Sequence, residues 1–521
     1  MKVRKLLVIV LVISALIGIA IVSTASVDEE PLVRIGVVPE AEQITLGSEG
    51  SFEVFDKETG DVLLTGANDN VSVLLESAGG VQTHYRLQVA WTSSRDNVDA
   101  WVQEAESYGY PTYIEDYNGG WRMHIGEFPA DAPWGERNDF RNEVIDLGLA
   151  GTDSFWRIVT VSEGSSALKV LFNGEEFIVE NNVALRSDNG IVTINGSPYR
   201  EIAEVGFNSN GTLAGINELP IEQYLKGVVP RELPPNPYDE IEAQKAQAVA
   251  ARTYTLANMG KRASDGYDLL PTTSDQVYGG YSAEHPISSQ AVDETRGIVA
   301  TYEGQLITAV YHSTSGGFTA NNEDVWDSDP VPYLRGVPVY QMGNKKGNAP
   351  PHAFINNANP NSLRAKKNGS FESDWSSYYR WTYEWTPEQI TQVLSNYYGL
   401  DVGEVFEINV LDRADSGRVL EIEYVTENGT FYEYKDRIRW SLPYINDSGN
   451  ESVLRSTLFH IEPTKKNKNS DEPTGFVVYG GGWGHGVGMS QTGAVGMAER
   501  GETFDSILKH FYTGIDLETS Y

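Results

Sequence analysis

Apolar and polar positions alternate in short runs over much of the first 215 residues, and Gly, Asn or Asp separates most of these runs. The pattern begins at Leu32 and returns after Val159, where Asn-Gly steps join successive runs. Such alternation is typical of strands with one buried face, and Asn-Gly favours a tight hairpin turn. We therefore expect one β-rich unit from Val33 to Gly215, interrupted by a segment of different character.

The interrupting segment, residues 84–160, has the pattern of a small separate unit. Apolar residues alternate from Tyr85 to Val89 and then follow helical spacing from Val98 to Ala105. Two strands, a second helix around residues 139–149 and a last strand around residues 156–159 complete the order strand, helix, strand, strand, helix, strand. The periodicity therefore predicts a βαββαβ insert.

The second half of the chain mixes helical and strand patterns. Alanines recur from Ala243 to Ala251, which predicts a helix with a smooth surface that other elements approach closely. A helix over residues 386–398 has Thr386 as its expected cap and Pro387 at its first position. Strands are expected between residues 405 and 437, and exposed loops at the polar stretches 341–376 and 463–475. The expected fold class is α+β: a β-rich region with an Ala-rich helix, plus the insert.

Residues 1–26 have the composition of an export signal. Basic residues precede an apolar stretch from Leu6 to Val22, and Ser23, Thr24 and Ala25 resemble a cleavage site. The apolar stretch also has nearly the length of a membrane span, so cleavage and retention as an anchor both remain open. No second stretch is comparably apolar, and we expect the remainder of the chain outside the cytoplasm, either secreted to the cell wall or anchored.

Composition excludes several classes of site and partner. The chain has no Cys, which excludes disulfides, a lipidated Cys anchor and Cys-ligated metal sites. Its net charge of −34 argues against a nucleic acid partner, because affinity for phosphates comes from Lys and Arg. The same charge weighs against binding an anionic cell-surface polymer by charge alone.

Glu232 is the first candidate for chemistry. It lies between Val229-Pro230 and Pro234-Pro235, in a stiff and apolar turn. Partial burial raises the pKa of a carboxyl group towards neutral pH, which suits a general acid. A solvated surface carboxylate is the alternative, because Glu is mostly exposed.

Two further segments carry polar and aromatic side chains on predicted loops. Gln276 and Tyr278, within residues 271–286, are able to line a sugar site, although these residues alone favour an ordinary Gly-Gly turn with a packed Tyr278. His312 ends an apolar strand and is followed by Ser313 and a Ser-Gly-Gly turn. This His could position a substrate or bind a metal, or it could be a structural residue bonded to the loop backbone.

The C-terminal run GGGWGHGVGMSQTG places Trp483, His485 and Gln491 among closely spaced glycines. It is not a phosphate-binding loop, because the Lys-Ser/Thr pair that holds phosphate and metal is missing. Nor does a βαβ unit surround it, as a dinucleotide site requires. Trp483 is suited to stacking on a sugar that His485 and Gln491 hydrogen-bond, or it is packed in the core at a Gly-rich turn.

Taken together and in order, these segments resemble the sporulation stage II protein D and amidase enhancer (SpoIID/LytB) family. The resemblance rests on LPIEQYLKGVVPRELP with KAQAVAARTYTL, then SDQVYGG, YHSTSGGFT and GWGHGVGMSQTG, and it covers roughly residues 200–521. The insert resembles the sporulation-related repeat (SPOR) domain through its Q-V strand, its GYP-Y step and WRMHIGEF, with a generic α+β insert as the alternative. That family's domain binds glycan strands stripped of peptides.

The resemblance implies a peptidoglycan lytic transglycosylase that forms 1,6-anhydro ends. The family's catalytic acid is the Glu of a Glu-Met-Pro step, which falls on Glu232 with Leu233 in place of Met. Some members bind zinc through Cys near the His-Ser-Thr motif, but Ser315 stands at that position, so we expect neither metal nor cofactor. The expected substrate-binding residues are Arg252, Gln276, Tyr278, His312, Ser313, Trp483, His485 and Gln491.

Two other functions remain possible from the sequence: a non-catalytic, glycan-binding enhancer of a cell-wall amidase, and an anchored scaffold for wall remodelling. Expected partners are peptidoglycan glycan strands and a cell-wall N-acetylmuramoyl-L-alanine amidase. The expected division of the chain is an export signal or anchor (1–26), a β-rich N-terminal part (27–83), a SPOR-like glycan-binding domain (84–160) and a SpoIID/LytB-like catalytic region (161–521).

Overall fold

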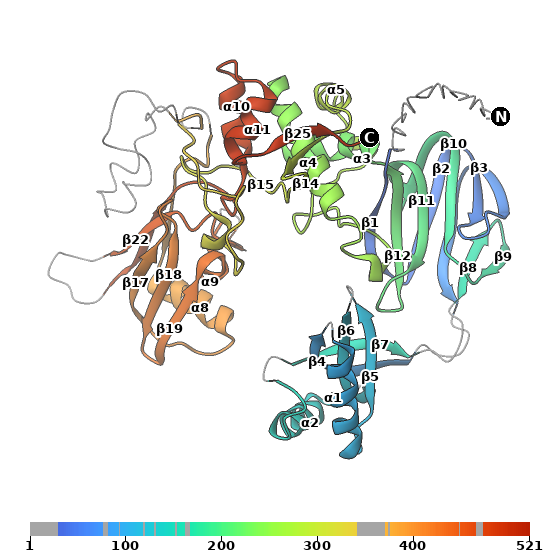
Figure 1. Ribbon diagram of the computed structural model, residues 1–521, viewed down its shortest axis with the longest axis horizontal. Coiled ribbons are helices and arrows are strands. Elements are labelled where there is room, and N and C mark those ends of the chain that lie inside the picture. Colours follow the sequence, from blue (N-terminus) through green and yellow to red (C-terminus); the bar gives the residue numbers. More distant parts are fainter. Residues whose placement is uncertain are drawn as a thin grey trace, which may run out of the picture.

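The computed structural model describes residues 30–76, 82–92, 94–117, 120–129, 132–151, 154–161, 167–340, 370–372, 376–446, 449–464 and 473–521 (Figure 1). The expected export signal or anchor lies outside these ranges, and so do most residues of the two polar stretches expected to be loops. Within the described ranges, no helix is both long and apolar enough to cross a membrane. Helices and strands are mixed in several sheets, which confirms the α+β class.

An eight-stranded antiparallel sheet forms the N-terminal part. Alternating side chains of its strands, such as Ile44 and Leu46, are fully buried in one core, as the period of two predicts. Its strands in spatial order are β1 (Leu32–Ala41), β12 (Leu213–Pro220), β11 (Ser197–Phe207), β10 (Val183–Ile194), β2 (Gln43–Asp56), β3 (Val62–Glu76), β8 (Ala167–Phe172) and β9 (Glu175–Val179).

The insert leaves and re-enters this sheet between two neighbouring strands. Glu76 at the end of β3 pairs with Ala167 at the start of β8, so the insert occupies the tip of a hairpin. It has its own four-stranded sheet in the order β5-β6-β4-β7 and its own apolar core around Leu87 and Val98. Its elements are β4 (Gln82–Thr92), α1 (Arg95–Ser107), β5 (Thr112–Tyr117), β6 (Gly120–Pro129), α2 (Trp134–Asp146) and β7 (Phe155–Val161).

A group of helices follows, with α4 at its centre (Figure 1). Alanines such as Ala246 and Ala250 are fully buried, and their small size lets α3, α5, α10 and α11 approach α4 closely. The elements are α3 (Ile221–Glu232), α4 (Ile241–Ala257), α5 (Pro286–Glu294), α10 (Gln491–Ala498), α11 (Phe504–Phe511), the sheet β14 (Gln305–Leu306), β13 (Ile298–Tyr302) and β25 (Asp516–Thr519), and the parallel pair β15 (Tyr311–His312) and β24 (Met489–Ser490).

A second β-rich unit lies between β15 and β24 in the chain. Thr386 and Gln389 form a reciprocal capping box at the start of α8, Pro387 holds its first position, and Gly399 ends it, which confirms the prediction for this helix. The elements are the 3-10 turn η3 (Asn322–Asp324), β16 (Trp381–Trp385), α8 (Pro387–Tyr398), β17 (Val405–Arg413), β18 (Val419–Thr426), β19 (Gly429–Tyr434), the 3-10 turn η4 (Lys435–Arg437), α9 (Ile438–Ser441), β20 (Tyr444–Ile445), β21 (Glu451–Ser452), β22 (Phe459–Thr464) and β23 (Gly475–Gly480). Two further 3-10 turns, η1 (Ala263–Asp265) and η2 (Tyr281–Ala283), lie between α4 and α5 in the chain.

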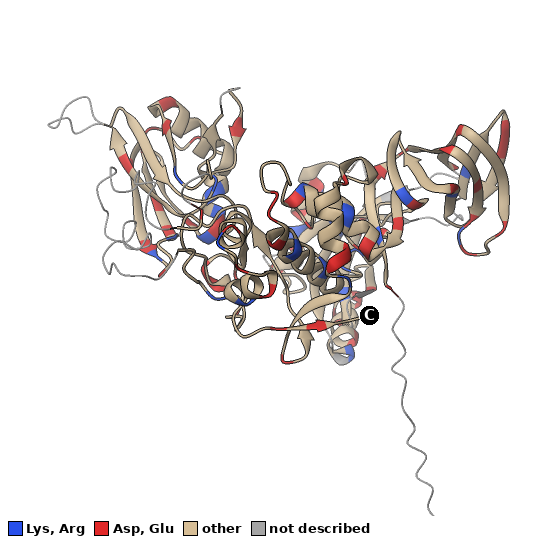
Figure 2. Cartoon of the chain, turned by 90° about the horizontal axis from the view of Figure 1, so that it is seen from above, with Lys and Arg blue, Asp and Glu red and all other residues tan. Residues whose placement is uncertain are grey.

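Figure 2 shows Asp and Glu in red throughout the described parts of the fold, with Lys and Arg in blue between them. The net charge of −34 is therefore not confined to one element or one unit. The chain passes from the helices into the second β-rich unit after β15 and returns at β24. These two strands pair, and the Gly-rich run before β24 lies beside the residues that follow β15.

Candidate functional site

Glu232 is the last residue of α3, and local sequence fixes its position. Leu233 is buried in the core, and Pro234 and Pro235 prevent the helix from continuing. The Glu232 side chain is itself only partly exposed, because the loop at Val277 and the strand β15 pack against it. The alternative of a solvated surface carboxylate is therefore wrong.

Three donors hydrogen-bond the Glu232 carboxylate. The Val277 N–H donates to Oε1 at 2.6 Å, and the side chains of Gln491 and Tyr311 also bond the carboxylate. Burial is the larger effect and raises the pKa of Glu232 to about 7, while the three hydrogen bonds act to lower it. Both the acid and its anion are therefore accessible near neutral pH, which suits a group that gives and then takes a proton.

Tyr311 is oriented by Gln276. The Gln276 Nε2–H donates to the Tyr311 Oη at 3.0 Å, and Thr255 donates to the Gln276 Oε1 at 2.8 Å. Because the Tyr311 oxygen already accepts from Gln276, its own hydrogen is left for Glu232. Burial raises the pKa of Tyr311 well above its ordinary value, so this hydroxyl stays a neutral donor.

The two histidines tie the Gly-rich run to β15. Val487 N–H donates to His485 Nδ1 at 3.1 Å, so His485 Nε2 carries the hydrogen that it donates to the Tyr311 carbonyl at 2.9 Å. Burial lowers the pKa of His485 to about 3 and that of His312 well below its ordinary value. His312 Nδ1 lies 3.1 Å from the Val487 carbonyl. Both rings are neutral at physiological pH and hold the backbone beside Glu232.

The closely spaced glycines follow from the backbone path of this run. Left-handed φ values recur at every second residue, and a side chain there is strained. At Gly488, φ is +70° and an added Cβ would lie 2.1 Å from the Val310 carbonyl oxygen, next to β15. The glycines with such φ values are Gly482, Gly484, Gly486 and Gly488.

Trp483 presents its ring to solvent. It is 40% exposed, so the alternative of a core tryptophan is wrong. Its backbone pairs with Thr314 through hydrogen bonds of 2.7 and 3.1 Å, and its ring packs at 4.4 Å between centroids against Tyr378. A half-exposed indole held in this way on a rigid loop can stack on a sugar ring.

Three family models match parts of the chain: the SPOR domain over residues 81–132, the stage II sporulation protein family over residues 209–302, and a domain of unknown function (DUF8618) over residues 320–488. An uncharacterized protein of Brachyspira hyodysenteriae is 30% identical over 368 residues, which are 68% of this chain and 84% of that protein. Stage II sporulation protein D of Bacillus subtilis is 28% identical over 58% of this chain and 75% of its own. The amidase enhancer of B. subtilis is 32% identical over 57% of this chain, but over 40% of its own length.

The chain belongs to the stage II sporulation protein D and amidase enhancer family. The resemblance of the insert to a SPOR domain is confirmed by the family match. Among solved structures, the peptidoglycan-binding domain of the B. subtilis cell wall lytic enzyme CwlC aligns over 17% of this chain and 100% of its own, with 16% identity and a TM-score of 0.13. That score does not establish a shared fold.

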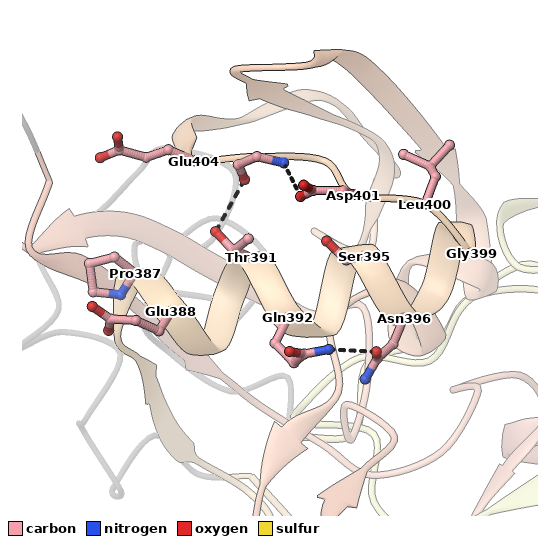
Figure 3. A pocket seen from close by; sticks show the side chains of 11 residues that line it. Pro387, Glu388, Thr391, Gln392, Ser395, Asn396, Gly399, Leu400, Asp401 and Glu404 are labelled. Atoms are coloured by element: carbon pink, nitrogen blue, oxygen red, sulfur yellow. Dashed lines mark hydrogen bonds between the residues drawn. The ribbon is translucent and has the colours of Figure 1, made fainter.

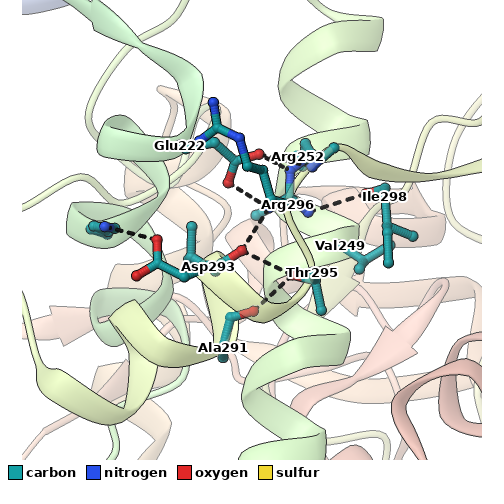
Figure 4. A network of polar contacts seen from close by, with 12 residues as sticks. Glu222, Val249, Arg252, Ala291, Asp293, Thr295, Arg296 and Ile298 are labelled. Carbon is teal, nitrogen blue, oxygen red and sulfur yellow. Dashed lines mark hydrogen bonds and ion pairs between the residues drawn. The ribbon is translucent and has the colours of Figure 1, made fainter. Parts of the chain in front are cut away.

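Two of the residues expected to bind substrate have their polar groups bonded inside the core. Arg252 is fully buried and ion-paired with Glu222, with Nη2 to Oε2 at 2.6 Å, in the network of Figure 4. Tyr278 is 7% exposed and donates to Asn217 Oδ1 at 2.8 Å, which is the packed alternative that the sequence left open. Both expectations are corrected for the same reason: each side chain is directed to a polar partner inside the core.

The other expected residues are arranged around Glu232 or the Gly-rich run. Gln491 contacts the carboxylate, whereas Gln276 is fully buried and acts through Tyr311. Ser313 is half-buried, and its carbonyl accepts from the Thr492 N–H at 3.0 Å. Trp483 offers the exposed ring of this set.

Sequence reasoning missed two residues of this family site. Tyr311 directly precedes His312 in the YHSTSGG motif, and that adjacency was the signal for it. Glu372 is fully buried and accepts from the Ser315 N–H at 2.7 Å, the Gly316 N–H at 2.9 Å and the Ser490 hydroxyl. It joins the Ser-Gly-Gly turn to the start of α10, and no sequence signal marked it, because it lies in a stretch expected to be a loop.

A shallow hollow elsewhere on the molecule contains none of these residues. It lies beside α8, between that helix and residues 399–404, with a volume of about 970 Å³ (Figure 3). Within the described part of the chain, no group of three or more His, Asp or Glu is placed to hold a metal ion. The candidate site is the group of residues around Glu232, which lies apart from this hollow.

Proposed function

We propose that this chain is a lytic transglycosylase that cleaves the bond between N-acetylmuramic acid and N-acetylglucosamine in peptidoglycan glycan strands. The observation that carries the proposal is the partly buried Glu232 carboxyl group at the end of α3, which accepts from the Val277 N–H at 2.6 Å and whose pKa burial raises to about 7. A carboxyl group with this pKa is protonated often enough to act as an acid and ionised often enough to act as a base at neutral pH.

The reaction needs one carboxyl group. Protonated Glu232 gives its proton to the glycosidic oxygen as the bond from that oxygen to C1 of the muramic acid breaks. The Glu232 carboxylate then takes the proton of the muramic acid 6-hydroxyl, whose oxygen bonds to C1 and closes the 1,6-anhydro ring. Glu232 ends protonated, as it began, and no water enters, so a second carboxylate to activate water is unnecessary.

The surrounding donors act on the anion formed between these two steps. Val277, Gln491 and Tyr311 each donate to the carboxylate, which lowers the energy of its charged form. Burial opposes ionisation and keeps the resting group protonated at or below neutral pH. Trp483 supports the sugar by stacking, and the SPOR domain holds the strand, best when its peptides have been removed.

Mutation of Glu232 tests this assignment. The protein from residue 27 onward and its Glu232→Gln variant are each incubated with peptide-stripped glycan strands, and the products are weighed by mass spectrometry. Glu40→Gln, which removes the same charge from an exposed position, is the matched control. We expect anhydro-ended fragments from the wild type and the control, and none from Glu232→Gln. Equal cleavage by Glu232→Gln would contradict the assignment.

A second function is favoured by the 32% identity with the amidase enhancer of B. subtilis. In that case the chain binds stripped glycan without cutting it and stimulates a cell-wall amidase. The same digest separates the two: intact strands that remain bound to both wild type and Glu232→Gln would support the enhancer, and amidase activity measured with either protein would then rise equally. Placement outside the cytoplasm, through residues 1–26, is part of both proposals.

A further inference from the structure

Arg455 lies in a cluster of aromatic rings beside the exposed tryptophan of the site. The Arg455 cluster consists of Arg455, Tyr378, Tyr383, Tyr444 and Trp483. The guanidinium carbon lies 4.3 Å from the ring centroid of Tyr378 and 5.2 Å from those of Trp483 and Tyr444. The Nε–H donates to the Tyr383 hydroxyl, and the Tyr383 and Tyr444 rings stack at 3.9 Å. These contacts hold the guanidinium group in one orientation.

The charge of Arg455 has no counter-ion in the part of the chain that the structure describes. Among the described residues, no carboxylate lies within ion-pairing distance of the Arg455 guanidinium group. The hydrogen bond to Tyr383 uses Nε and leaves both terminal nitrogens available. The side chain is partly exposed. In a chain with a net charge of −34, an arginine held by aromatic rings instead of a carboxylate is suited to an anion from outside the chain.

The cluster adjoins the site of Glu232. The Arg455 carbonyl accepts from the Gly484 N–H at 2.9 Å, which fixes Arg455 to the residue after Trp483. Trp483 in turn pairs with Thr314, three residues after Tyr311, whose hydroxyl bonds Glu232. On the other side, burial and, to a smaller extent, the nearby Tyr378 raise the pKa of Tyr238. Because the Arg455 guanidinium carbon lies 5.2 Å from the Trp483 ring centroid, a sugar that contacts Trp483 would lie near this positive charge.

We propose that Arg455 binds the lactyl carboxylate of an N-acetylmuramic acid residue whose stem peptide has been removed. The proposal rests on the proposed function and names the substrate form that the same site selects. In an intact strand the lactyl group is an amide, which carries no charge. Hydrolysis of that amide leaves a carboxylate, and a guanidinium group binds a carboxylate through paired hydrogen bonds. The reaction that supplies this substrate is therefore an amidase reaction.

The test compares two uncut ligands that differ only at the lactyl group. One is a muramic acid tetrasaccharide with free lactyl carboxylates, and the other is the same tetrasaccharide with each carboxylate converted to a methylamide. Affinity is measured by calorimetry with the Glu232→Gln protein as the background, so that neither ligand is consumed. Arg455→Gln, Arg455→Lys and the control Arg437→Gln are added to that background. Arg437 has a side chain that is 63% exposed and lies outside the cluster.

We expect the background protein to bind the carboxylate ligand about tenfold more tightly or better than the methylamide, as a charged hydrogen bond predicts. Arg455→Gln should abolish this preference, Arg455→Lys should retain part of it, and Arg437→Gln should leave it unchanged. A preference that survives in Arg455→Gln would overturn the proposal. If Arg455→Gln does not fold, an undiminished preference for the carboxylate ligand in Arg455→Lys would show that paired hydrogen bonds from Arg455 do not bind it, and would overturn the proposal.

A third ligand separates the lactyl carboxylate from the carboxylates of a stem peptide. Tighter binding of the peptide-bearing tetrasaccharide, lost in Arg455→Gln, would show that Arg455 binds the peptide and would overturn the proposal. Because all ligands stay uncut, the preference is measurable even if the wild type forms no anhydro products. Failure of the enzyme assignment and failure of this proposal are therefore distinct results.

Discussion

At the scale of single residues, the balance between burial and hydrogen bonding at Glu232 decides what the carboxyl group can do. Burial raises its pKa to about 7, while Val277, Gln491 and Tyr311 act in the opposite direction. The Pro-flanked turn in the sequence indicated a partly buried Glu232. The three donors come from positions far from it in the chain, so local sequence could not identify them as its partners.

The pH dependence of cleavage follows from this pKa. The reaction begins with protonated Glu232, so kcat/KM should fall about tenfold per pH unit above about pH 7. Tyr311→Phe removes a donor that lowers the pKa of Glu232, and the alkaline limb should therefore move to higher pH. Tyr434→Phe, at an exposed position, is the control. A limb that does not move in Tyr311→Phe would show that the hydroxyl does not act on Glu232.

Glu232 should also destabilise the folded protein at alkaline pH. Its pKa is about 7 in the folded chain and 4.5 in a model peptide, so the folded state binds more protons between these pH values. Its contribution to stability is present below pH 4.5 and is lost as the pH rises through 7. Glu232→Gln should therefore have a higher free energy of unfolding than wild type at pH 8.5, by up to about 3 kcal/mol, and show no such gain at pH 4 when both are unfolded by denaturant.

At the scale of elements, features set by neighbouring residues could be predicted, whereas features set by contacts between distant segments could not. The bounds of α8 could be predicted because Thr386, Pro387 and Gly399 act within the helix and its next residue. Arg252 and Tyr278 could not be placed, because whether a side chain of α4 or of a loop faces the core depends on which elements pack there. Helix α10 begins at Gln491, where the side chain of the preceding Ser490 caps it.

The path of the Gly-rich run gives a prediction for one glycine. Gly488→Ala should place a methyl group against the Val310 carbonyl at a left-handed φ, displace β24 from β15 and lower both stability and cleavage. The expected cost exceeds about 2 kcal/mol in unfolding free energy. Gly190→Ala is a matched control, because φ there is +68° but nothing lies within 4 Å of the added Cβ. Equal effects of the two substitutions would show that the close contact is unimportant.

At the scale of the whole molecule, the chain combines the proposed glycan-cleaving site with a SPOR domain on the tip of a hairpin. The different sequence pattern of residues 84–160 allowed the insert to be predicted, because its apolar periodicity differs from that of the flanking strands. The close approach of the Gly-rich run to β15 could not be predicted, since it is set by pairings such as β15 with β24 that join distant segments.

Removal of the insert tests whether the two units are independent. Glu76 and Ala167 already pair, so replacing residues 77–166 by an Asn-Gly turn should restore an ordinary hairpin and leave the rest folded. We expect unchanged cleavage of short soluble glycans and weaker binding to purified cell-wall sacculi, measured by sedimentation. Loss of cleavage of the short glycans by a folded deletion variant would show that the insert helps to form the site.

The central claim is that Glu232 drives ring closure within one sugar without the entry of water. It is tested most directly by digesting peptide-stripped strands in water enriched in ¹⁸O and weighing the new muramic acid ends. The account predicts ends that are lighter than reducing ends by one water, contain no ¹⁸O, and are absent with Glu232→Gln. Reducing ends labelled with ¹⁸O, formed by the wild type and lost in Glu232→Gln, would contradict it and show hydrolysis instead.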